Sequence, residues 1–135
     1  MGFQEFFRYL GAPLKARWSW GAIAESGDVY LAVWEGERDP ARPRVLVFDP
    51  LPNASHGVAE RAYHLRVIRS ERRRVFCVIR PGNWDDRRPE EYHENTLLMV
   101  GGKLVKDEKR DGYIWLEDAG RIAACDVVAD TGKRH

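Results

Sequence analysis

This sequence has few cysteines, no long apolar run and almost no excess of charge of either sign. Its 135 residues include two cysteines, and 22 lysine and arginine residues oppose 21 aspartate and glutamate residues. Cys77 and Cys125 each lie in an apolar segment with no second cysteine nearby, so we expect buried, reduced thiols rather than a zinc site or a disulfide framework. A net charge of +1 excludes a basic coat over the whole surface, so nucleic-acid binding would need a local patch.

The sequence also lacks a membrane span, a targeting signal and an internal repeat. No segment approaches the ~20 apolar residues that a helix needs to cross a bilayer. The first residues, MGFQEFFRYLGAPLK, lack the charged start and long apolar segment of a secretory signal. We therefore expect a cytoplasmic protein that does not bind membranes. Its length fits a single domain, 1–128, followed by a flexible tail, 129–135.

Hydrophobic periodicity predicts two helices and a series of short strands. Apolar residues at helical spacing in FQEFFRYLG predict a short N-terminal helix that ends near Gly11. Val58, Ala62, Leu65 and Ile68 form one apolar stripe, which predicts a longer helix over 57–72. Strands are predicted in RWSWGAIA, VYLAVWE, RVLVFD, RRVFCVIR, TLLMVGGKLVK, YIWLED and RIAACDVVA, with Gly101-Gly102 as a hairpin turn.

The order of these elements predicts the fold class. Strands come first, one long helix follows, and further strands complete the chain, without a βαβ alternation. This order predicts an α+β domain with a curved, mostly antiparallel β-sheet or partly open barrel, closed by the long helix.

Three of the five tryptophans lie in one predicted hairpin, RWSWGAIAESGDVYLAVW. A two-residue turn at Ser26-Gly27 would pair Ala24 with Val29 and continue from there. One face would then carry small residues beside flat aromatic ones: Ser19, Gly21, Ile23, Tyr30, Ala32 and Trp34. Such a face predicts a hollow for a planar group, although a slip of one residue would exchange the two faces. The other interpretation is that the tryptophans are core residues and Gly21 permits a bend of the sheet.

The order and spacing of several segments resemble small bacterial domains of the PUA superfamily. These segments are FFRYLGAPLKARWSWGAI, VYLAVW, HGVAERAYHLRVIR, VFCVIR and TLLMVGGKLV…YIWLE, and the resemblance covers most of 6–128. It is to the EVE-like and SRA-like modules of modification-dependent restriction systems, and it implies a PUA-like barrel with a surface pocket. In such a pocket, aromatic side chains hold a modified base that has been flipped out of DNA or RNA. The base pocket predicted for this chain comprises Trp18, Ser19, Trp20, Gly21, Tyr30 and Trp34.

The restriction modules are attached to nucleases, whereas here the chain continues for only seven residues after Val128. We therefore expect no cleavage by this chain, and a separate nuclease or effector protein would supply it.

Arginine residues cluster in and around the predicted long helix. A stripe of arginines is the feature that contacts with a phosphate backbone require. Arg61 and Arg69 fall within the apolar stripe, where they line a groove or extend to water at its edges. The other interpretation of the cluster is a solvated charged face. The predicted backbone contacts are Arg17, Arg61, Arg69, Arg73 and Arg74.

The long polar loop PGNWDDRRPEEYHEN predicts a further contact region. Loops of this length in a compact domain are often functional, and Trp84 could insert into a base stack. Asn83 and Trp84 are the predicted loop contacts. The loop also contains residues of metal-ligand types, but their spacing matches no known site. His64 lies outside the apolar stripe of the helix and is expected to be exposed.

Together these features predict a nucleic-acid-binding module, with DNA favoured over RNA and with no cofactor and no metal. A first alternative is a small hydrolase or nuclease that uses Asp49, Asp85 or Glu94. A second alternative is a protein-interaction domain whose aromatic face is its interface. A nucleic-acid reader needs the arginines and the tryptophans on one side of the molecule, whereas an enzyme needs carboxylates that converge in a cleft.

Overall fold

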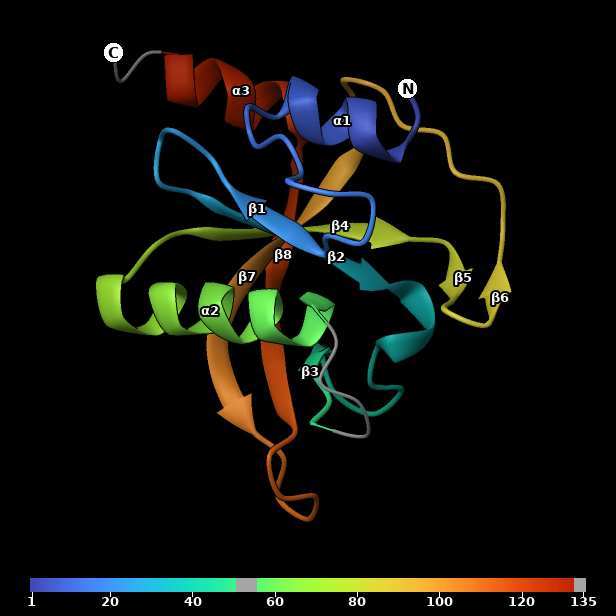
Figure 1. Cartoon of the computed structure of the whole chain (residues 1–135), viewed down its shortest axis with the longest axis vertical. Helices are drawn as coiled ribbons and strands as arrows, with labels where there is room; N and C mark the ends of the chain where they lie inside the picture. The colour runs from blue at the N-terminus through green and yellow to red at the C-terminus, as the bar shows by residue number, and fades with distance from the viewer. Residues whose placement is uncertain (51–55, 133–135) are drawn as a thin grey trace.

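The computed structural model describes residues 1–50 and 56–132. In these residues three helices accompany a six-stranded sheet and a small two-stranded one (Figure 1). In chain order the elements are α1 (Phe3–Tyr9), β1 (Gly21–Ile23), β2 (Val29–Trp34), the 3-10 turn η1 (Glu35–Glu37), β3 (Arg44–Phe48), α2 (His56–Glu71), β4 (Val75–Arg80), β5 (Gly82–Asn83), β6 (Asp86–Arg87), β7 (Leu97–Lys106), β8 (Ile114–Ala123) and α3 (Ala124–Gly132).

The main sheet has the strand order β1-β2-β4-β7-β8-β3. All neighbouring strands are antiparallel except β2 and β4, which run parallel with Val29 opposite Val75 and Trp34 opposite Arg80. The α+β class and the mostly antiparallel sheet are therefore confirmed. The sheet is open, with β1 and β3 at its edges, and is not a closed barrel. No βαβ alternation was expected, and among the described strands there is one parallel crossover: the chain leaves β2, passes through β3 and α2, and returns to pair with β2 through β4.

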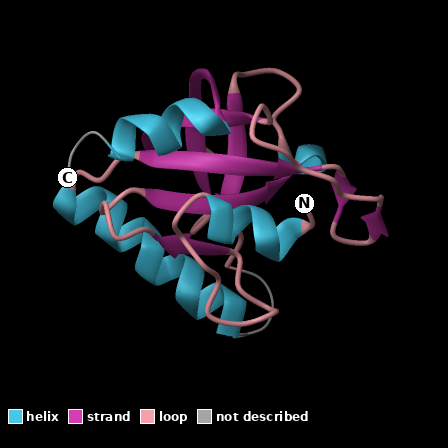
Figure 2. Ribbon diagram, turned by 90° about the horizontal axis from the view of Figure 1, so that it is seen from above, coloured by secondary structure: helices cyan, strands magenta, loops and turns pink. Residues whose placement is uncertain are grey.

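Helices cover both faces of this sheet, as the view from above shows (Figure 2). On β2 and β4, Tyr30 and Phe76 face α1 and α3, while Leu31 and Cys77 face α2. Burial on both faces explains why the sequences of these two strands are nearly continuous apolar runs. Residues from α1 and α3 complete one core, and Leu65, Val67 and Ile68 of α2 complete the other.

The strands β7 and β8 form one long, bent hairpin, which corrects two predictions. Gly101 and Gly102 lie within β7 and are not a turn. A Cβ atom at Gly101 would lie 2.4 Å from Cγ1 of Val75 and 2.9 Å from Cδ2 of Leu116, so this glycine permits close packing where the pairing of β7 is irregular. The predicted last strand is also wrong, because β8 ends at Ala123 and the chain continues as helix α3.

The C-terminal end of the described chain is helical where a flexible tail was predicted. Residues 129–132, expected in a flexible tail, belong to α3, and 133–135 lie outside the described residues.

None of the described helices is both long enough and apolar enough to cross a membrane. Both cysteines are free thiols, with Cys77 buried and Cys125 half-buried.

Candidate nucleic-acid interface

The hairpin of β1 and β2 has a register one residue away from the predicted one. Ile23 lies opposite Val29 and Gly21 opposite Leu31. The cause is the turn, in which the amide of Ala24 donates to the Asp28 carbonyl at 2.9 Å and makes a longer loop than two residues. As a result, Gly21 and Tyr30 lie on opposite faces of the sheet.

The predicted open hollow on this hairpin is therefore wrong. Tyr30 is buried, and its ring stacks on Phe76 with centroids 5.6 Å apart. Burial raises the pKa of the Tyr30 hydroxyl. Gly21 is buried against the strand, because a Cβ atom there would lie 2.5 Å from the Tyr30 carbonyl oxygen.

Two of the predicted tryptophans project into solvent from a segment with a fixed backbone. Trp18 is 45% exposed and Trp20 is 38% exposed, whereas Ser19 between them is buried. The two carboxylate oxygens of Glu60 on α2 accept hydrogen bonds from the Ser19 hydroxyl and from the Trp20 amide, each at 3.0 Å. The Trp20 ring lies against Gly57 in the first turn of α2, where a Cβ atom would come within 2.5 Å of the indole.

Arg61 holds the same segment from inside the molecule. Its guanidinium donates to the carbonyls of Trp20 at 2.8 Å, Ala32 at 2.6 Å and Val47 at 2.8 Å. Arg61 is only 5% exposed, and burial lowers its pKa to about 10. The prediction that Arg61 contacts a phosphate is wrong, because this side chain ties β2 and β3 to the tryptophan segment.

His64 is buried under the same segment, which contradicts its expected exposure. Its Nδ1 atom has no hydrogen-bond partner among the described residues and lies 3.3 Å from the position of a Cβ atom on Gly21. Burial lowers the pKa of His64; Glu60 opposes this shift, while Arg61 and Lys15 reinforce it.

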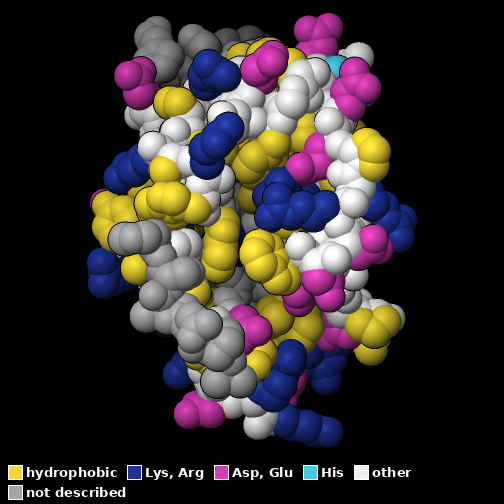
Figure 3. All heavy atoms as spheres, turned by 45° about the vertical axis from the view of Figure 1, so that its right-hand side comes forward, with side chains coloured by type: hydrophobic (Ala, Val, Ile, Leu, Met, Phe, Trp, Pro, Cys, Tyr) yellow, Lys and Arg dark blue, Asp and Glu magenta, His cyan; other side chains and the backbone are white. Residues whose placement is uncertain are grey.

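Trp34 belongs to a second aromatic cluster, at the end of β2 and β4. Figure 3 looks onto this end, where dark-blue basic side chains lie among yellow hydrophobic ones. The guanidinium carbon of Arg80 lies 4.3 Å from the centroid of the Trp34 ring and 3.9 Å from that of Phe3. Glu90 accepts two hydrogen bonds of 2.7 Å from Arg80 and one from the Tyr92 hydroxyl. Although burial acts to raise the pKa of Glu90, these bonds lower it overall.

The two predicted loop contacts lie on the small β5–β6 hairpin next to this cluster. Trp84 is 69% exposed at its tip. The Asn83 side chain lies against Gly36 of η1, where a Cβ atom would come 1.5 Å from Asn83 Oδ1. Glu35, Glu37 and Asp85 directly adjoin Trp34, Gly36 and Trp84 in the sequence. The guanidinium of Arg87 lies 5.4 Å from the centroid of the Trp84 ring, so the tip of the hairpin carries charges of both signs.

The outer surface of α2 carries the arginines that are free to meet a ligand. Arg66 and Arg69 form no ion pair with any described residue, and the guanidinium of Arg66 lies 5.5 Å from the centroid of the exposed Tyr63 ring. Both arginines border a groove of about 350 Å³ between α2 and the ends of β3 and β8. The groove is lined by Phe48, Ala62, Leu65, Arg66, Arg69, Ser70 and Ile114. Arg17, another predicted contact, is also exposed.

Arg73 and Arg74, both predicted to contact phosphates, are engaged within the molecule. Arg74 donates to both carboxylate oxygens of Asp28, at 2.9 and 2.8 Å, and to Asp130 of α3 at 3.0 Å. These bonds raise the pKa of Arg74. Arg73 pairs with Glu71 at 3.4 Å. The assignment of Arg74 to phosphate binding is therefore corrected to a structural link between the β1–β2 turn and α3.

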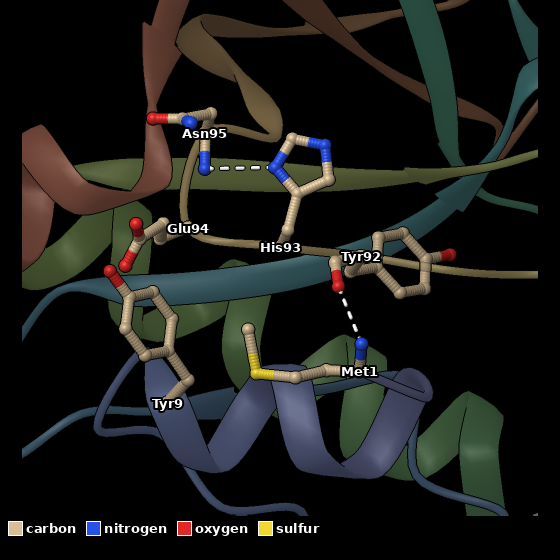
Figure 4. A pocket seen from close by; sticks show the side chains of 6 residues that line it. All are labelled: Met1, Tyr9, Tyr92, His93, Glu94 and Asn95. Atoms are coloured by element: carbon tan, nitrogen blue, oxygen red, sulfur yellow. Dashed lines mark hydrogen bonds between the residues drawn. The ribbon is translucent and has the colours of Figure 1, made fainter.

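A shallow pocket of about 480 Å³ lies between α1 and the loop before β7 (Figure 4). It is lined by Met1, Tyr9, Tyr92, His93, Glu94 and Asn95. The Met1 amine donates to the Tyr92 carbonyl at 2.6 Å, and the Asn95 amide donates to His93 Nδ1 at 3.1 Å. The Tyr9 hydroxyl points toward the Glu94 carboxylate. Burial, Cys125 and Glu94 together raise the pKa of Tyr9. This pocket was missed in the sequence, because Met1 and Tyr9 reach residues 92–95 from the N-terminal end of the chain.

The three carboxylates named for a hydrolase do not all lie together. Asp49 and Asp85 lie near Glu37, whose pKa is raised by burial and by these two neighbours against the effect of Arg110, whereas Glu94 borders the pocket beside Tyr9. Within 1–50 and 56–132, no three His, Cys, Asp or Glu side chains lie close enough to hold a metal ion.

No protein-family model matches the sequence, and neither a curated protein nor a solved structure matches it.

Proposed function

We propose that this protein binds nucleic acid by stacking an unpaired or flipped base on the exposed indoles of Trp18 and Trp20. The observation that carries the proposal is the way in which these two indoles are presented. Their backbone is fixed by Glu60 and by the buried Arg61, yet both tryptophans remain partly exposed. A buried charge is costly, and this one holds exposed aromatic groups in place.

Stacking and charge together suit a nucleic-acid strand. A base that stacks on an aromatic side chain contributes ~1–3 kcal/mol, and every base has a flat face. Arg66 and Arg69 follow Gly57, which Trp20 contacts, by nine and twelve residues. They therefore lie about 14 and 18 Å further along the axis of α2 and about 180° and 120° around it. A strand that stacks on the tryptophans would have to cross α2 to reach these two arginines. Phosphates of the bound strand would pair with these two arginines, which are not neutralised by described residues.

A more specific proposal, that the protein reads a modified base, follows from the resemblance of the sequence to the PUA superfamily. A mostly antiparallel sheet, a long helix and an exposed tryptophan segment support a PUA-like reader of a modified base in DNA. The β1–β2 face is filled by core side chains, so the base would stack at the Trp18–Trp20 segment rather than within the hairpin. A separate nuclease or effector protein would act on the bound site.

The experiment is fluorescence anisotropy with labelled oligonucleotides, single-stranded and duplex, with and without modified cytosine, at two salt concentrations. Trp18→Ala and Trp20→Ala should each weaken binding of the preferred oligonucleotide about ten- to a hundredfold. Trp84→Ala is the matched control, because it removes an exposed indole from the other cluster. Wild-type affinity in both Trp18→Ala and Trp20→Ala would overturn the proposal.

A further inference from the structure

Aromatic rings and guanidinium groups alternate at the end of β2 and β4. Arg80 lies over the rings of Phe3 and Trp34, and Arg87 lies over the rings of Trp34 and Trp84. Trp34 therefore contributes to two successive guanidinium sites. The first site is closed and internal, while the second opens to solvent through the exposed Trp84.

The inner site, formed around Arg80, shows which groups bind a guanidinium tightly in this protein. The guanidinium carbon of Arg80 lies 3.9 and 4.3 Å from its two ring centroids, and Glu90 accepts two hydrogen bonds from it. Rings hold the flat cation, and a carboxylate binds its N–H groups.

The outer site has the same rings and the same cation, but the cation is held loosely. The guanidinium carbon of Arg87 lies 5.7 Å from the centroid of Trp34 and 5.4 Å from that of Trp84. Arg87 is exposed and forms no ion pair with a described residue. The hairpin that carries Trp84 does not depend on Arg87 for its position, because Asn83 lies against Gly36 of η1.

Carboxylates adjoin the outer site beside its arginines. Glu35 follows Trp34 directly, and Asp85 follows Trp84 directly. Burial is the largest cause that raises the pKa of Glu37; Asp49 and Asp85 add to the shift, while Arg110 opposes it. A guanidinium held over the rings would be attracted to these carboxylates.

We infer that the position of the Arg87 guanidinium over the rings of Trp34 and Trp84 is a binding site for an arginine side chain of a partner protein, whose guanidinium takes the place of Arg87. The site would give this chain a protein partner independently of its nucleic-acid ligand. Because Arg87 itself lies over the rings, the apparent affinity for a partner arginine is reduced by the fraction of molecules in which Arg87 occupies this position.

The test uses blocked Gly-Arg-Gly peptide and the whole ¹⁵N-labelled chain, with the indole N–H signals as the readout. In Arg87→Ala the peptide should shift the Trp34 and Trp84 signals saturably, with an affinity about fivefold or more above that of the wild type. A Gly-Lys-Gly peptide should bind more weakly, because a compact ammonium stacks less well on rings. A Gly-citrulline-Gly peptide, which is neutral but similar in shape, should not bind. Arg88→Ala, a matched change on the neighbouring residue, should retain wild-type affinity.

Three results would overturn the inference. One is an Arg87→Ala protein that binds the arginine peptide no better than the wild type does. Another is equal binding of the citrulline peptide, and the third is an oligonucleotide that shifts these two indoles more than the peptide does. Arg87→Gln gives the same comparison with a neutral side chain that still reaches the rings, should the alanine variant fold poorly. Oligonucleotide binding by Trp18→Ala is measured separately. If the arginine peptide does not bind, the nucleic-acid proposal is unaffected, and the failure of either proposal can be distinguished from that of the other.

Discussion

The carboxylate of Glu60 accepts a hydrogen bond from the backbone amide of Trp20 at 3.0 Å, forty positions away in the sequence. Its other oxygen accepts a hydrogen bond from the Ser19 hydroxyl. One side chain on α2 therefore fixes the backbone from which two exposed indoles project. The contacts of Glu60 therefore link the stability of the segment before β1 to the placement of Trp18 and Trp20.

Replacing Glu60 by alanine should release this segment. The loss of two hydrogen bonds to a carboxylate should lower the free energy of unfolding by about 1–3 kcal/mol. Oligonucleotide affinity should fall as well, because the indoles would no longer be held in one orientation. Chemical denaturation and anisotropy on the same samples measure both effects. Glu71→Ala, at an exposed position of the same helix, is the control, and a loss as large in that variant would contradict the role of Glu60.

Replacing Arg61 by methionine should destabilise the fold much more than an exposed change does. Three buried carbonyl oxygens, those of Trp20, Ala32 and Val47, would lose their donor. We expect a loss of about 3–5 kcal/mol in the free energy of unfolding. Arg66→Met should change it by less than about 0.5 kcal/mol, because Arg66 is exposed. Thermal melts compare the two variants, and similar melting temperatures would refute the structural role of Arg61.

Acidification should destabilise the protein through His64. Burial keeps the pKa of His64 below its ordinary value, so the unfolded chain binds a proton at a pH where the folded chain does not. Stability therefore falls as the pH drops through the ordinary histidine pKa of about 6.5. Denaturation at about pH 7.5 and about pH 5.5 should show a smaller difference in His64→Gln than in the wild type. An unchanged pH dependence in that variant would count against the effect, since the lowered carboxylate pKa of Glu90 acts at more acidic pH.

Arg66 and Arg69 should govern the salt dependence of nucleic-acid binding. Each phosphate contact that is removed should reduce the slope of log K against log salt by about 0.7 to 0.9. Arg66→Ala and Arg69→Ala should therefore flatten the slope and weaken binding to all sequences alike. Arg42→Ala provides the control, because Arg42 is exposed but paired with Glu108. If the slopes of all three variants match the wild type, the groove on α2 does not contact the strand.

Arg74 should matter for stability rather than for binding. Its two bonds to Asp28 neutralise a carboxylate whose side chain is only 4% exposed. Because Arg74 itself is 39% exposed, we expect Arg74→Gln to lower the free energy of unfolding by about 2 kcal/mol. A double-mutant cycle with Asp28→Asn measures the coupling. A coupling near zero would show that the link contributes nothing.

The elements with strong periodicity could be predicted from the sequence. The helix predicted over 57–72 is α2, His56–Glu71. Its predicted apolar stripe is only partly the buried face, because Ala62 is exposed whereas Arg61 and His64 are buried. The continuous apolar run of β4 correctly indicated a central strand, covered on both faces. In β4 burial fixes the pattern of residues directly.

The elements that depend on distant packing could not be predicted. Gly101 permits an approach to Val75 and Leu116, and the sequence alone cannot separate this use of glycine from a turn. The segment predicted as the last strand is short and mostly apolar, which suits a strand or a helix equally. The hairpin register failed because it depends on the loop that ends at Asp28, whose carboxylate is held by Arg74.

The candidate site could be predicted by residue type but not by placement. The sequence identified Trp18 and Trp20, but it could not identify Glu60, because the partners of this side chain lie far away in the chain. Arg61 gave one usable signal, its position within the apolar stripe of α2, and this position agrees with its burial.

The pairing of β3 has a consequence for the order of folding. In the sheet β3 has a single neighbour, β8, although β3 lies in the first half of the chain and β8 near its end. On a ribosome, β3 must therefore wait for its partner strand in the sheet until β8 has emerged. Such non-local pairing slows folding, since a long segment of chain must be closed before its contacts form. The nascent protein should thus complete its sheet late and cooperatively, rather than strand by strand as it is synthesised.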